Sequence, residues 1–203
     1  MKINVREDHV EIEGYVNAIE RKSKPLMSRI GQFVERICKG AFKSAITRND
    51  DVHILLNHDW NRDLGSTKQG NLELTEDNIG LHARATISDK EIIEKARNGD
   101  LIGWSFGFSD RDVELTTIDG ILNRAVKDLN LYEVSILDRT KRPAYDGNLI
   151  TVRDDGETIQ FRGIELLDDT RQSEENSQQQ QPLKADHIDY SKYENIINEM
   201  RGK

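Results

Sequence analysis

The stretch 103–108, GWSFGF, decides the fold interpretation because it alternates strictly between small and large aromatic side chains. Successive side chains of a β-strand point to opposite faces, so this alternation predicts a strand with its three aromatic side chains sealed against a core. Ser105 and Gly107 would then lie on the other face, where glycines let another backbone approach the serine hydroxyl. Two interpretations fit the pattern: Ser105 is a nucleophile, or it is an ordinary serine in an aromatic-rich strand.

Strand patterns recur on both sides of this stretch. From alternation and β-branched content we expect strands near 10–16, 51–56, 71–74, 80–87, 102–109 and 123–137. One helix is clearly marked: Ser88 and Glu91 form an S-x-x-E capping box, and Gly99 fits its C-terminal cap. A second helix near 33–46 would contain Gly40. Many strands with few helices predict a mainly β (α+β) fold, a closed or nearly closed β-barrel flanked by helices.

Charge is distributed unevenly along the 203 residues. The chain has 37 acidic and 29 basic residues, a net charge of −8, but residues 1–153 hold 25 acidic and 23 basic residues, a net of −2. Residues 154–203 hold 12 acidic and 6 basic residues, a net of −6, and the run 168–182 has no apolar residue. Such a run buries too little surface to offset its ordering entropy. We therefore predict a compact domain over 1–153, an acidic linker over 154–182 and a C-terminal arm over 183–203.

The predicted arm has one regular feature. Four apolar residues follow the spacing of a single helical face: Tyr193, Ile196, Ile197 and Met200. A short terminal helix and a docking peptide that folds on a partner both fit this spacing.

The composition argues against several classes of protein. Acidic balance disfavours nucleic-acid binding, which needs clustered Lys and Arg to neutralise phosphates. A single cysteine, Cys38, excludes a disulfide framework and a Cys-based zinc site. No segment approaches the roughly 18 consecutive apolar residues of a membrane helix, and the N-terminus lacks a signal-peptide core. We expect a soluble intracellular protein with no cofactor, no metal, no nucleic acid and no membrane partner.

His58 is a candidate general base. It follows the apolar segment 51–56 and stands among the polar residues of LLNHDW, where a strand would hold the imidazole but leave it open to substrate. His53 lies five residues earlier, and in a continuous strand it would point to the opposite face, which makes the two histidines a poor metal pair. A structural or surface role for His58 is the competing interpretation.

Glu133 is a candidate acidic partner. Within LNLYEVSIL it is expected on the same strand face as Leu131 and Ser135, where an unpaired carboxylate would be costly to bury. A histidine would satisfy it and would be held in one tautomer. An arginine such as Arg84 or Arg124 would satisfy it as well.

The residues around Ser105 also match G-x-S-x-G, the nucleophile elbow of α/β-hydrolases, which raises an esterase or lipase as a rival function. That elbow needs a strand before the serine and a helix after it, with the acid and then the histidine downstream. Here the predicted helix precedes the serine, strand-like sequence follows, and the later histidine is His187, beyond the polar run. The context therefore disfavours this rival.

Several short strings, taken in chain order, resemble the caudovirus prohead (capsid maturation) proteases. They are GAF at 40–42, LLNHDW at 55–60, LG at 64–65, GL at 80–81, GD at 99–100, SFGF at 105–108, L-x-EVS at 131–135 and PAY at 143–145. No single string decides the matter, whereas the ordered set is specific. The resemblance runs from about Gly14 to Tyr145, and the charged run 138–142 departs from the family's usual small apolar and polar residues.

The resemblance implies a serine peptidase related in fold to the herpesvirus maturation protease. Its serine and histidine correspond to Ser105 and His58, and Glu133 is the position expected for the third member. Oxyanion donors are expected in the loop after Leu137. Such an enzyme acts inside the immature capsid, in the host cytoplasm. It cleaves the scaffolding segment of the major capsid protein or a scaffold protein, and itself, and it self-associates.

A second rival keeps the resemblance but not the activity. In a non-catalytic scaffolding or capsid-assembly protein the shared residues would be a relic, and the acidic arm favours this alternative. A scaffold would leave coexpressed capsid protein at full length, whereas a protease would shorten it.

Overall fold

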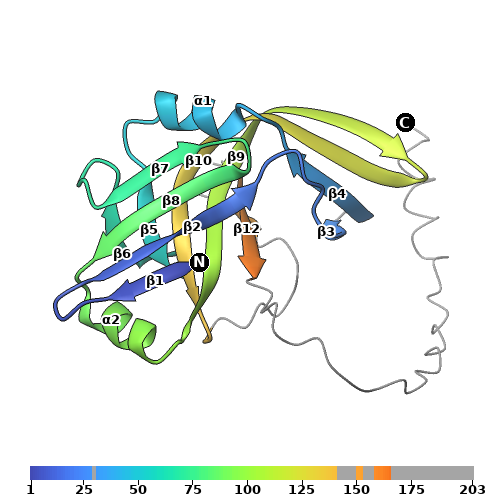
Figure 1. Ribbon diagram of the computed structural model, residues 1–203. Coiled ribbons are helices and arrows are strands. Elements are labelled where there is room, and N and C mark those ends of the chain that lie inside the picture. The colour runs from blue at the N-terminus through green and yellow to red at the C-terminus, as the bar shows by residue number, and fades with distance from the viewer. Residues whose placement is uncertain (29–30, 141–149, 153–157, 166–203) are drawn as a thin grey trace, which may run out of the picture. The chain divides into compact units, whose positions relative to one another are not determined.

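The computed structural model describes residues 1–28, 31–140, 150–152 and 158–165 (Figure 1). The strands are β1 (Lys2–Val5), β2 (Val10–Ala18), β3 (Leu26–Ser28), β4 (Gly31–Ile37), β5 (His53–Leu56), β6 (Asp59–Ser66), β7 (Leu72–Glu76), β8 (Gly80–Ile87), β9 (Leu101–Ile118), β10 (Ile121–Asp138), β11 (Ile150–Val152) and β12 (Thr158–Glu165). The helices are α1 (Ala41–Arg48) and α2 (Lys90–Arg97). The predicted mainly β class is confirmed.

These strands form two sheets. One has the antiparallel order β1-β2-β8-β7, in which the strands predicted near 71–74 and 80–87 pair as β7 and β8. The other has the order β11-β12-β9-β10-β4-β3, with β5 joined to β10 and β6 joined to β5. This second sheet curls into a half-barrel, and the strand pairings of the described residues close no barrel. At the outer end of the β9–β10 hairpin, residues 122–126 of β10 pair in parallel with β4, so this end continues the second sheet beyond the first (Figure 1).

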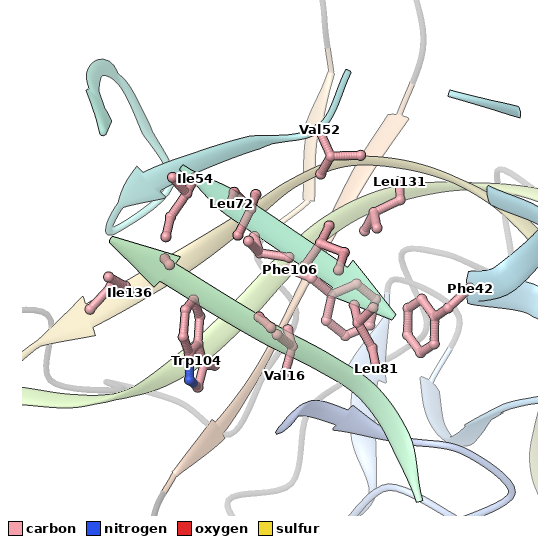
Figure 2. Close-up of a cluster of buried hydrophobic side chains, with 14 of the residues drawn as sticks. Val16, Phe42, Val52, Ile54, Leu72, Leu81, Trp104, Phe106, Leu131 and Ile136 are labelled. Carbon is pink, nitrogen blue, oxygen red and sulfur yellow. The ribbon is translucent and has the colours of Figure 1, made fainter. Parts of the chain in front are cut away.

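The aromatic face of β9 lies in the core, as its alternation predicts. Trp104, Phe106 and Phe108 are all at most 2% exposed and pack with apolar residues of both sheets (Figure 2). Phe42 of α1 meets Phe106 edge to face, with ring centroids 5.3 Å apart. Truncating one such buried aromatic ring costs about 3–5 kcal/mol, so this face anchors β9 firmly.

A β-bulge in β10 changes which of its side chains face the core. Leu131 lies opposite Phe108 and Glu133 lies opposite Gly107, which leaves Tyr132 as the extra residue. An inserted residue reverses the alternation beyond it. Leu131 therefore lies in the core while Glu133 and the residues that alternate with it point to the opposite face. The prediction that Leu131 and Glu133 share one face is wrong for this reason.

Both predicted helices need correction at their starts. The N-cap of α2 is Asp89, whose carboxylate accepts a hydrogen bond from the Ile92 N–H at 3.1 Å, so Ser88 is not the cap. Gly99, with φ of 70°, does follow the C-terminus as predicted. The segment predicted as one helix over 33–46 is β4 followed by α1, separated by Gly40 at φ of 93°.

β12 lies beyond the charge boundary at residue 153 and is tied into the second sheet. It pairs antiparallel with β9, and the Arg162 guanidinium holds both carboxylate oxygens of Glu35 at 2.7 and 3.1 Å. The chain separates into two units after Leu167, and residues 166–203 lie outside the described residues, so the arm and the part of the predicted linker beyond β12 stay predictions. Within the described part of the chain, no helix has the length and apolar content to cross a membrane.

Candidate active site

His58 is presented by a tight turn. Leu56 of β5 pairs with Asp59 of β6, so only Asn57 and His58 connect the two strands. Their φ angles are 57° and 61°, and positive φ at both central residues is the pattern of a type I′ hairpin turn. Asn and His are among the residues that tolerate this left-handed backbone best. The imidazole is therefore held by a short hairpin at the end of β5.

β10 lies between the strand that leads to the histidine and the strand that carries the serine. It pairs with β5 along one edge and with β9 along the other. Ser135 is directly opposite Ser105, and Glu133 is directly opposite Gly107. Directly opposed residues of an antiparallel pair point to the same face. Ser105, Glu133 and Ser135 thus share the face that points away from the aromatic core.

His58 and Glu133 are in contact. Nδ1 of His58 lies 2.8 Å from Oε1 of Glu133, and their side chains are 13% and 1% exposed. A carboxylate accepts hydrogen bonds, so the contact assigns the proton to Nδ1 and leaves Nε2 as an acceptor. Arg124, one of the two arginines that the sequence offers as a partner, instead contacts Glu35 and Asp110.

Ser105 lies on the strand next to this pair and is almost completely covered. Its exposed fraction is 1%, with Ser135 opposite it on β10 and Gly163 opposite it on β12. The ring of Phe161, also from β12, lies 4.3 Å from the His58 imidazole, centroid to centroid. Among the described residues the Ser105 hydroxyl has no hydrogen bond, to His58 or to any other group. The structure joins His58 to Glu133 and places Ser105 on the same face beside them.

Gly107 provides the space for the acidic group. A Cβ atom at this position would lie 2.5 Å from Oε1 of Glu133 and 2.9 Å from the Phe161 ring. The glycine thus admits two side chains, whereas the sequence pattern suggested the approach of another backbone.

Ser135 is a site residue that sequence reasoning missed. Its hydroxyl donates to Oε2 of Glu133 at 2.5 Å and accepts from the His58 main-chain N–H at 3.0 Å. Its place two residues after the candidate acid is the signal that could have revealed it, because residues i and i+2 of a strand share a face.

Asn57 and Asp138 were also missed, and together they anchor the turn. Nδ2 of Asn57 donates to the Asp138 carboxylate at 3.0 Å, and the Asp138 N–H donates to Oδ1 of Asn57 at 3.1 Å. Nζ of Lys95 lies 2.9 Å from the same carboxylate, whose side chain is 2% exposed. Burial opposes ionisation of Asp138, but hydrogen bonds from Thr140, Lys95 and Asn57 outweigh it and hold the pKa of this carboxyl well below its usual range. Asp138 belongs to the charged run 138–142 that departs from the family's usual residues, and its charge is paired with Lys95 inside the protein.

The second histidine belongs to a different cluster. Nδ1 of His53 lies 2.8 Å from Asp63, and its ring packs edge to face against Trp60. In the described ranges no three His, Cys, Asp or Glu side chains form a group that could hold a metal ion.

The esterase rival is not supported by the local fold. Ser105 lies inside β9, which continues to Ile118, so no helix begins after the serine. The sharp strand-to-helix turn that defines a nucleophile elbow is therefore absent at this serine. The expected oxyanion loop after Leu137 falls largely on residues 141–149, outside the described residues.

Comparison with known proteins supports one family. No curated protein and no solved structure matches the chain. A family model described as the caudovirus prohead serine protease matches residues 1–160, a range that includes His58, Ser105 and Glu133. Because this match spans most of the 203 residues, the chain belongs to the caudovirus prohead serine proteases, a family of serine peptidases.

Proposed function

We propose that this chain is a bacteriophage prohead maturation endopeptidase in which Ser105 is the nucleophile, His58 the general base and Glu133 the group that orients the base. One observation carries the proposal: the His58–Glu133 contact of 2.8 Å lies on the sheet face that Ser105 shares. A nucleophile next to a base that is itself oriented by a third group is the arrangement of covalent acyl transfer.

The reaction follows from the tautomer of His58. Nε2 accepts the hydroxyl proton as Ser105 Oγ attacks the scissile carbonyl carbon, and the imidazolium then donates this proton to the leaving amine. Water then attacks the carbonyl carbon of the acyl-enzyme while Nε2 takes its proton, and the imidazolium returns that proton to Ser105 Oγ as the acyl group is released. Glu133, 1% exposed, stabilises the imidazolium formed in each half-reaction.

Ser105 is a better nucleophile candidate than its neighbour Ser135. The Ser135 hydroxyl proton is already donated to the Glu133 carboxylate, and its oxygen accepts from the main chain of His58. The Ser105 hydroxyl makes no hydrogen bond to the other described residues, so its proton is available to the base.

Family membership supports the substrates and the setting that we propose. The substrates are the scaffolding segment of the major capsid protein or a separate scaffold protein, and the chain itself. The reaction takes place within the immature capsid in the host cytoplasm, where self-association of the protease concentrates it. We also propose a fold related to that of the herpesvirus maturation protease; the mainly β content and the curled half-barrel favour this relationship.

Coexpression with the capsid protein tests the proposal. We expect the wild type to shorten the capsid protein, and Ser105→Ala and His58→Ala to leave it at full length while remaining folded. Ser109→Ala is the matched control, because Ser109 is another buried serine of β9 (7% exposed) whose hydroxyl contacts Tyr132 instead of the site. Normal processing by Ser105→Ala would reject the assignment. Full-length capsid protein with the wild type would favour the non-catalytic scaffold.

A further inference from the structure

We propose that Ser135 is a positioning residue that ties the acid of the site to the main chain of the base. This inference rests on the proposed function, since it concerns how the proposed pair is held. Ser135 does not touch the reacting atoms in this account; it acts through Glu133 and His58.

The two hydrogen bonds of Ser135 meet at one oxygen atom. The hydroxyl proton goes to Oε2 of Glu133 at 2.5 Å, while the oxygen accepts the His58 N–H at 3.0 Å. Oε1, the other oxygen of the same carboxylate, accepts from the His58 ring at 2.8 Å. Glu133 and Ser135 therefore hold His58 at both its ring and its backbone, in a closed loop of three hydrogen bonds.

Burial explains why this loop matters. The Glu133 and Ser135 side chains are 1% and 0% exposed, so water cannot replace a lost partner easily. A carboxylate with both oxygens bonded has one orientation, and a hydrogen bond to a charged group is about twice as strong as one between neutral groups. Without the hydroxyl, Oε2 would be left unpaired and the carboxylate could turn away from Nδ1.

The bulge at Tyr132 makes this arrangement available. It turns Glu133 and Ser135 together onto the face opposite the core, next to the hairpin turn. The turn is fixed to the same strand a second time, because the Asn57 N–H donates to the Ile136 carbonyl at 2.9 Å. Within four residues β10 thus supplies the acid Glu133, its hydrogen-bond partner Ser135, and the Ile136 carbonyl that holds the turn.

Two variants of the full chain separate positioning from simple packing. Ser135→Ala removes the hydroxyl, and Ser135→Thr keeps it with one added methyl group. We expect Ser135→Ala to lower kcat about 10- to 100-fold while KM stays within about twofold, because a hydrogen bond to a charged group is lost but no substrate contact is. Ser135→Thr should keep kcat within about threefold of the wild type. The assay uses a peptide that spans the capsid-protein cleavage site found by coexpression.

A spectroscopic measurement provides a readout independent of turnover. Proton NMR of protein labelled with ¹⁵N-histidine detects the low-field Nδ1–H signal of His58, which should move or broaden in Ser135→Ala and persist in Ser109→Ala. An unchanged signal together with a kcat within twofold of the wild type would overturn the inference. A folded Ser135→Thr as slow as Ser135→Ala would overturn it too. Retained activity in Ser105→Ala would instead reject the proposed function, so the two failures are distinguishable.

Discussion

Asn57 and Asp138 exchange two hydrogen bonds across the end of β10, so the residue before the candidate base is clamped to a buried carboxylate. Both bonds are near 3 Å, and the carboxylate is also held by Lys95 of α2. The hairpin turn that carries His58 is thereby connected to a helix distant from it in sequence. Backbone preference alone does not fix the turn.

Replacing Asn57 with glycine should reveal what the clamp contributes. Glycine keeps the preference for the φ of 57° but removes the amide, so the Asp138 carboxylate loses a buried partner. We expect the free energy of unfolding, measured by urea denaturation, to fall by about 1–3 kcal/mol. Asp119→Gly is the matched control, because Asp119 has φ of 52° in the exposed β9–β10 turn. Equal stability of Asn57→Gly and the wild type would contradict the clamp.

The depressed pKa of Asp138 should appear in the pH dependence of stability. A carboxyl whose pKa is lower in the folded state stabilises the protein above its unfolded value, about 3.9, and this contribution is lost as the pH falls below that value. We therefore expect Asp138→Asn to be less stable than the wild type near pH 7 and the difference to shrink toward about pH 2. Urea midpoints across this range measure it, with the exposed Asp112→Asn as control. A difference that does not change with pH would exclude the mechanism.

Gly107→Ala should displace the acid of the site. The added Cβ would lie 2.5 Å from Oε1 of Glu133, closer than real Cβ contacts allow, so the carboxylate must move away from His58. Misplacing a catalytic group by about 1 Å costs on the order of 100-fold, and we expect a loss of this size in kcat/KM. Gly70→Ala controls for general destabilisation: its Cβ would meet no atom within 4 Å, but its φ of 79° strains an alanine, and the folded variant should keep normal kcat/KM. Full activity of Gly107→Ala would show that Glu133 does not need its observed position.

Local pattern predicted much of the fold but not the register of β10. The alternation of GWSFGF was sufficient to place the β9 aromatic residues in the core, since it needs no information from elsewhere in the chain. The bulge at Tyr132 could not be predicted because it is a property of the β9–β10 pairing. It turns Glu133 to the face opposite Leu131, so the face predicted for this carboxylate is wrong, whereas a histidine does lie next to it.

The residues that support the site were harder to predict than its candidate core. Histidine and glutamate are candidate acid–base residues in any sequence. The roles of Ser135 and Asn57, in contrast, depend on the side chains that the fold places next to them. The high net charge of the last 50 residues also hid the strand β12 from prediction. Its Phe161 and Arg162 contact residues that precede them by about a hundred positions or more. Such long-range pairings leave no periodic signal in a short window of sequence.

Phe161 should control access to the serine. Its ring lies against the His58 imidazole and is 8% exposed, while Ser105 is 1% exposed. We expect Phe161→Ala to increase the rate at which a small fluorophosphonate labels Ser105, at a temperature where the variant remains folded. Phe33→Ala, a comparably buried phenylalanine of β4, is the control for general destabilisation. Labelling at the wild-type rate, or more slowly, would show that Phe161 does not limit access.

The location of the fluorophosphonate adduct tests the central claim most directly. Peptide mass spectrometry of the labelled full chain identifies the serine that has reacted, and the same reaction with His58→Ala measures the contribution of the base. We predict an adduct on Ser105 in the wild type and labelling at least about 100-fold slower in His58→Ala. An adduct on Ser135 or on another serine, or equally fast labelling of Ser105 without His58, would contradict the account.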